Sequence, residues 1–158
     1  MNKFLIFLFL FVTFSTSFIS ADELKPGKWN FIVENEYCYI GSLPTNTEIA
    51  EGKKRDATYI LVYRINKSPE TIVQIEAGYP YDQKKNVEVN IDKVSYEFFS
   101  EEATPETAWT KKDNEVIFAM KKGITLVVKV YSSRGSLIVD TYTLNGFTKA
   151  YNKLTKDC

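Results

Sequence analysis

Alternation of apolar and polar residues is the feature that most restricts how this chain can fold. Residues 87–91 alternate aliphatic with polar side chains, and residues 94–98 repeat the alternation directly afterwards. A period of two places the apolar side chains on one face of a half-buried β-strand. The second run is either the same strand after a bend or its hairpin partner. Further strands are expected at residues 29–33, 37–40, 59–65 and 72–77.

The clearest local prediction is a β-hairpin over residues 124–144. A two-residue turn at Arg134 and Gly135 would place Lys129 directly opposite Asp140. Such an opposite-charge pair stabilises a sheet by about 0.2–1 kcal/mol. In this register the face toward the core carries Leu126, Val128, Val130, Leu137 and Val139. We therefore expect Asp140 to pair with Lys129, or with Arg134 folded back from the turn; the alternative is a polar contact in a ligand groove.

Helical periodicity is confined to two short segments. Residues 113–122 begin with Asp113 as a candidate N-cap and are followed by Gly123 as a terminator. Residues 147–155 place their apolar side chains on one stripe, which would pack on a sheet. The polar stretch 44–56 is expected to be a loop. The chain should therefore form a mainly-β, single antiparallel β-sandwich-like domain with a short internal helix and a C-terminal helix.

The N-terminus has the order of a secretory signal. Lys3 precedes an apolar run, and small residues ending at Ala21 precede an acidic pair. The run is shorter than the roughly 20 apolar residues that a membrane-spanning helix needs, although a retained anchor is the alternative. We expect residues 1–21 to be a signal peptide and 22–158 to be the mature domain, with no membrane span after cleavage. The expected location is the periplasm, or a secreted or envelope-associated state.

Cys38 and Cys158 are the two cysteines of the chain. Two thiols in one exported domain usually pair in an oxidising compartment. Because the bond would close most of the mature chain into one loop, it could stabilise the fold by about 5 kcal/mol. The alternative is a free thiol or an intermolecular bridge. We expect a structural disulfide.

The composition excludes several kinds of chemistry. The chain has no histidine, which removes Ser-His-Asp and Cys-His nucleophilic arrangements and the usual zinc sites. Acidic and basic residues balance, 20 against 20, so no basic footprint for nucleic acid exists. A hydrolase using carboxylates is an alternative, but the acidic doublet Glu101-Glu102 is expected in a solvated loop. We expect no catalytic, cofactor-binding or metal-binding residues.

Four aromatic residues lie in or beside predicted turns, where loops carry recognition residues. They are Tyr79, Tyr81, Phe99 and Trp109. They are candidates for a binding patch, and the alternative is that they fill the core. A small-ligand carrier with an internal cavity is a further hypothesis. The partner, an envelope component or another protein, and the oligomeric state are not indicated by the residues.

Several short segments occur in an order that resembles the invasion-associated locus B family of bacterial envelope proteins. The segments are residues 133–136, 140–144, 146–147, Ala150 and Cys158, with Arg55, 59–64, 78–79, 108–109 and 119–123 upstream. The resemblance implies a periplasmic or envelope-associated β-sandwich-like domain from alphaproteobacteria, in a family named for a role in host-cell invasion in some pathogens. No catalytic residues define the family. The resemblance thus implies an exported, non-enzymatic binding or interaction module.

Overall fold

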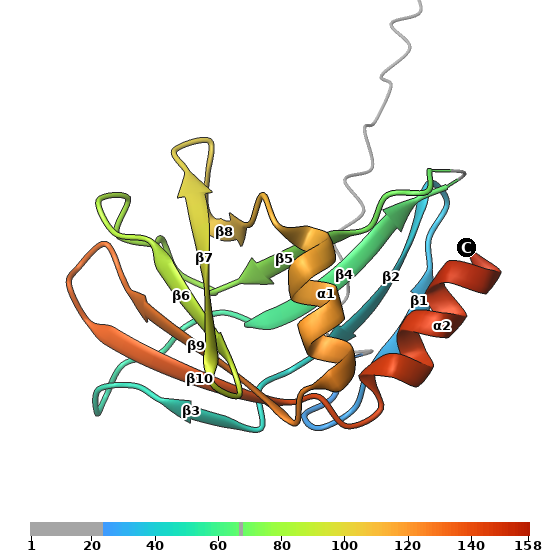
Figure 1. The fold of residues 1–158 in the computed structure, drawn as a ribbon. Helices are drawn as coiled ribbons and strands as arrows, with labels where there is room; N and C mark the ends of the chain where they lie inside the picture. The colour runs from blue at the N-terminus through green and yellow to red at the C-terminus, as the bar shows by residue number, and fades with distance from the viewer. Residues whose placement is uncertain (1–23, 67) are drawn as a thin grey trace, which may run out of the picture.

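The computed structural model describes residues 24–66 and 68–158, and Figure 1 shows the strands and helices formed by this part of the chain. The strands are β1 (Asn30–Val33), β2 (Tyr37–Ser42), β3 (Asn46–Glu48), β4 (Tyr59–Ile65), β5 (Ile72–Glu76), β6 (Val87–Ile91), β7 (Val94–Glu101), β8 (Thr104–Trp109), β9 (Thr125–Tyr131) and β10 (Leu137–Thr143). The helices are α1 (Asp113–Lys122) and α2 (Phe147–Asp157). The expected signal peptide, residues 1–21, lies outside the described residues.

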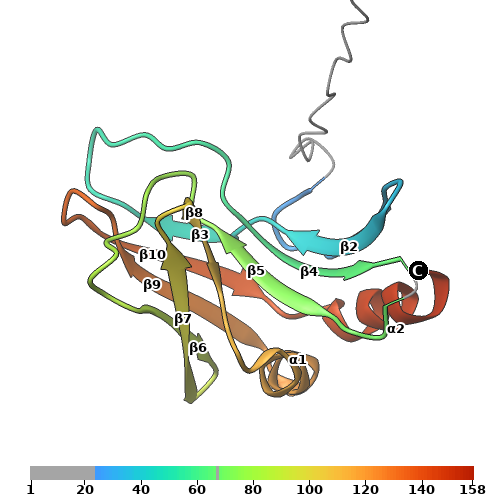
Figure 2. The same ribbon diagram turned by 90° about the horizontal axis from the view of Figure 1, so that it is seen from above.

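The strands form one antiparallel sheet of ten, in the order β1-β2-β4-β5-β8-β7-β6-β9-β10-β3. The sheet curls, so that strands from its two ends enclose a common core, as the view from above shows (Figure 2). Ile40 and Val62 from the β2–β4 half share that core with Val89 and Val128 from the β6–β9 half. The mainly-β, antiparallel fold with an internal and a C-terminal helix is therefore confirmed.

Both helices pack on the core, and α2 does so through the apolar stripe that the sequence predicted. Helix α2 buries Phe147, Ala150 and Leu154, and it contacts β1, β2 and β4. Helix α1 contacts β5 and α2. No helix in the described ranges is long and apolar enough to cross a bilayer.

Asp113 does not cap helix α1 as predicted. The helix begins at Asp113 itself, with Lys112 at the N-cap position and no side-chain capping bond. The Asp113 carboxylate instead accepts the Val73 N–H over 2.7 Å. This bond lets the first turn of α1 hold strand β5. The C-terminus follows the prediction, because the Gly123 N–H donates to Ala119 O over 2.8 Å.

The β9–β10 hairpin is shifted by one residue from the predicted register. Asp140 lies opposite Val128 rather than opposite Lys129. The connection has three residues instead of two, because the Ser132 N–H donates to Ser136 O over 2.9 Å. Three-residue hairpin loops combine a tight turn with a left-handed residue. The predicted cross-strand pair of Lys129 with Asp140 is therefore wrong.

The left-handed residue of this loop is Gly135, with φ of 80°. Because side chains alternate along a strand, a slip of one residue turns every side chain of β10 to the opposite face. Leu137, predicted to face the core, is 49% exposed. The face toward the core instead carries Ile138, Asp140 and Tyr142.

Strands β3 and β8 were not predicted. Residues 46–48 lie in the stretch expected to be a loop, and their side chains are polar. They become a strand because β10 offers a free edge, and Thr47 lies opposite Asp140 there. Strand β8 contains Pro105, which weakens a strand signal. The expected solvated doublet Glu101-Glu102 is exposed at the turn between β7 and β8.

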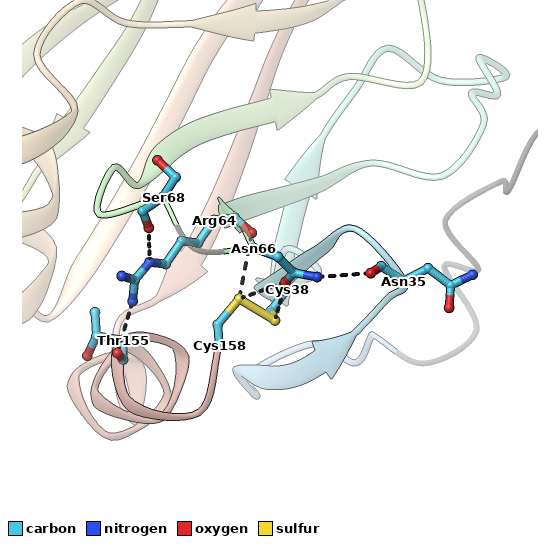
Figure 3. The surroundings of a disulfide bond; sticks show 7 residues. All are labelled: Asn35, Cys38, Arg64, Asn66, Ser68, Thr155 and Cys158. Carbon is cyan, nitrogen blue, oxygen red and sulfur yellow. Dashed lines mark hydrogen bonds between the residues drawn. A yellow bond between two sulfur atoms is a disulfide. The ribbon is translucent and has the colours of Figure 1, made fainter.

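The disulfide joins Cys38 in β2 to Cys158 directly after α2 (Figure 3). The two Cα atoms are 5.8 Å apart, and the bond spans 120 positions of sequence. Polar contacts surround it. Arg64 Nη1 donates to Thr155 O over 2.9 Å, and the Asn66 side-chain oxygen lies 3.6 Å from Cys38 Sγ. The last turn of α2 is thereby held against the ends of β2 and β4.

Candidate functional site

A buried ion pair lies where the β3–β4 loop crosses strand β10. Asp140 is only 3% exposed, because the observed register turns it toward the core. Arg55 Nη1 donates to Asp140 Oδ2 over 2.7 Å and Nη2 to Oδ1 over 2.5 Å. The Thr47 hydroxyl donates to Oδ1 over 2.7 Å and accepts a bond of 2.8 Å from Arg55 Nη2. Asp140 therefore pairs with Arg55, which corrects the predicted pairing with Lys129 or Arg134.

Three tyrosines surround this pair with apolar ring surface. Tyr142 and Tyr81 are almost completely buried, and the Arg55 guanidinium carbon lies 5.9 Å from the centre of the Tyr79 ring. The pKa values of Tyr79 and Tyr142 are raised. Burial is the larger cause, and the charge of Asp140 is the second. Burial alone would lower the pKa of Arg55, but the bond to Asp140 and its charge outweigh burial and raise it. The phenols thus stay neutral and the guanidinium stays charged.

A pocket of about 580 Å³ opens above the ion pair. It lies among the β3–β4, β5–β6 and β9–β10 loops, and its lining includes the cations Lys53, Lys54, Arg55 and Arg134, the acids Asp56 and Glu106, and the residues Ser132, Ser133, Ser136 and Tyr79. The Tyr79 hydroxyl is buried and makes no hydrogen bond of normal geometry with a described residue. We call this site the Arg55 pocket.

Gly78 lets two loops of the Arg55 pocket approach each other. Its φ is 69°, in the left-handed region, and a Cβ added to it would collide with the backbone oxygen of Asp56. The Asp56 N–H donates to Gly78 O over 3.1 Å. The residue that follows Arg55 is thereby fixed against the β5–β6 loop.

Gly78→Ala should destabilise the protein clearly more than Gly135→Ala. Both glycines have positive φ, 69° and 80°, so each alanine should cost about 1 kcal/mol through backbone strain. A Cβ at Gly135 would meet nothing within 4 Å, whereas at Gly78 it meets backbone. Urea unfolding of the two variants measures the difference. Equal losses would contradict the close approach of the two loops.

The structure separates the four aromatic residues that were proposed as one patch. Tyr79 lines the Arg55 pocket. Tyr81 is 1% exposed and belongs to the core, so it cannot contact a partner directly. Phe99 and Trp109 lie opposite each other on β7 and β8, and neither lines the pocket. Of the four residues, Tyr79 alone belongs to this site.

Sequence reasoning did not find Arg55 as a member of the site. Its loop was assigned no partner, since a contact 85 positions along the chain has no local signal. One sign was present in the composition. Lysine strongly outnumbers arginine in this chain, and a guanidinium is the cation that binds a carboxylate through two parallel bonds. Arg55, next to Lys53 and Lys54, was therefore a candidate partner for a buried carboxylate.

Within residues 24–66 and 68–158, no group of three or more His, Cys, Asp and Glu side chains is arranged to hold a metal ion. The curled antiparallel sheet with its two helices is a mainly-β fold that a solved structure shares. The crystal structure of invasion associated protein B from Bartonella henselae has this fold, with a TM-score of 0.59 and 18% identity over 82% of this chain and 92% of that one. No curated protein sequence matches the chain.

The sequence model of the invasion associated locus B (IalB) family matches residues 34–155. The match covers most of the chain, and the protein therefore belongs to this family.

Proposed function

We propose that this protein is an exported, non-enzymatic binding module of the cell envelope, placed in the periplasm or at the cell surface, and that its partner is held at the Arg55 pocket. Export is supported by the signal-like leader and by the disulfide, since such bonds persist outside the cytosol. Family membership supports an envelope role. The family name also makes a part in host-cell invasion a reasonable hypothesis for this chain.

The observation that carries the binding proposal is the charge and rigidity of the Arg55 pocket. Asp140 balances the charge of Arg55, and beyond this pair three cationic side chains line the pocket against two acidic ones. Arg55 is held in place by three hydrogen bonds to Asp140 and Thr47, which use three of the five donors of a guanidinium. These bonds leave two donors of the guanidinium unused, and they fix its place in the lining. Loops held by a rigid sheet are the usual location of recognition residues.

An anionic group of the partner fits this lining best. Lys53, Lys54 and Arg134 are exposed, so they can attract such a group and adjust around it. Serine hydroxyls at three positions offer further donors. The pocket is open at the surface and formed by loops, which suits an anionic part of a larger molecule.

Reversing the three exposed charges should abolish capture of the partner. We expect wild-type protein, crosslinked in native envelopes and recovered by pull-down, to retain a specific partner. The K53E/K54E/R134E variant should recover it at least about tenfold less, because like charges now face each other.

The matched control is K93E/K149E/K156E, which reverses three exposed lysines outside the pocket. This control should recover the partner as the wild type does. Circular dichroism checks that all three proteins are folded. Equal recovery by the pocket variant, or no specific partner in repeated experiments, would overturn the proposal.

A further inference from the structure

The sheet has a second aromatic surface on the side that faces away from the main core. Leu24, Tyr39 and Leu61 form a separate buried cluster there, and partly buried apolar residues pack around it. The apolar residues that the two helices bury belong to the main core instead. Neither helix therefore covers this outer face of β2 and β4.

A groove of about 340 Å³ lies on this outer face. Strand pairing places Tyr37 opposite Ile65, and Leu61 opposite Gln74, so these side chains project to the same side. The groove is lined by Glu36, Tyr37, Leu61, Tyr63, Ile65 and Gln74. We call it the outer tyrosine groove. Two tyrosines form its aromatic part, and Ile65 is 54% exposed at its end.

The described lining of the groove is acidic. Among residues 24–66 and 68–158, Glu36 is its charged residue, and no lysine or arginine lines it. Carboxylates also lie beside the tyrosines of this face. Burial raises the pKa values of Tyr37 and Tyr63. The charge of Glu34 raises the pKa of Tyr37 further, and the charge of Asp113 does the same for Tyr63. The aromatic face thus combines neutral phenol rings with a negative field.

We propose that the outer tyrosine groove binds a lysine or arginine side chain of an extended basic peptide. The charges are complementary, because Glu36 pairs with the cation while the Tyr37 and Tyr63 rings attract it electrostatically. The aliphatic stem of a long cationic side chain lies on Leu61 and Ile65. A peptide also covers the exposed Ile65, which a free small cation leaves in water. This site is distinct in place and in charge from the Arg55 pocket.

The probe for this site is a fluorescein-labelled octapeptide of alternating lysine and alanine, titrated against the full chain and followed by fluorescence anisotropy. We expect saturable binding. Glu36→Gln and Tyr63→Leu should each weaken it about two- to fivefold, since the first removes the ion pair and the second removes one of the two rings. The double variant should weaken it more than either single change.

Glu102→Gln is the matched control, because it removes an equal charge from an exposed turn far along the chain. It should leave the affinity unchanged. The proposal is overturned if Glu102→Gln weakens binding as much as Glu36→Gln does, since this would indicate attraction to the overall charge. Unchanged affinity in the double variant would also overturn it, and so would displacement of the peptide by spermine at equal concentration of positive charge.

Discussion

Asp140→Ala should lower the free energy of unfolding by about 3–5 kcal/mol, which is the range for breaking a buried ion pair by removing one partner. The reason is that Arg55, with its side chain 9% exposed, would keep its charge without a counterion. Thr47 would also lose its acceptor at Oδ1. Urea unfolding of the oxidised protein, followed by circular dichroism, measures the loss.

Two further variants show whether this loss belongs to the ion pair. Arg134→Ala removes an exposed arginine and should change stability by less than about 0.5 kcal/mol. Replacing both partners, as in R55M/D140L, should restore much of the stability, since apolar pairs of similar size often substitute for buried ion pairs. A loss in Asp140→Ala no larger than in Arg134→Ala would mean that the Arg55 pairing is not formed in solution.

Removing the disulfide should have the second large effect. The C38A/C158A variant is expected to lose about 2–5 kcal/mol, since the bond restricts an unfolded chain over 120 positions. The fold should survive in this variant, because Phe147 and Leu154 still anchor α2 in the core. Hydrogen exchange should show the earliest loss of protection in α2, whose last turn the bond holds against β2.

Reduction supplies the check on this expectation. Wild-type protein with a reductant should unfold at the same urea concentration as C38A/C158A, whereas the variant should not respond to the reductant. Thiol titration of the denatured native protein should find no free thiol. Two titratable thiols, or unfolding that does not depend on reductant, would contradict a structural disulfide.

Much of the local structure follows from the sequence, because it depends on neighbouring residues. The predicted strand at 59–65 has the bounds of β4, and the run at 87–91 has the bounds of β6. Helix α1 covers the predicted residues 113–122. For β6 and α1 the period of the apolar residues was sufficient, and for β4 the nearly unbroken apolar run was sufficient. Asp113 failed as a cap because a distant backbone N–H, that of Val73, took its carboxylate.

The candidate site depends on a choice between two registers that local rules cannot separate. Both a two-residue and a three-residue loop fit Ser133-Arg134-Gly135, and the predicted register even offered a charge pair for Asp140. That pair is worth less than about 1 kcal/mol on a surface. The observed register places Asp140 where Arg55 and Thr47 both reach it. Contacts from another loop thus outweighed the local preference.

The sequence by itself indicated both helices and the strands other than β3 and β8, and it indicated the two cysteines that close the chain. Only the tertiary structure decided which face of β10 meets the core, and therefore which partner Asp140 has. It also decided that residues 46–48 become a strand, because a polar segment pairs only where another strand offers an edge. Alternation along the chain sets a periodicity, whereas the register between strands is set by contacts that the fold alone creates.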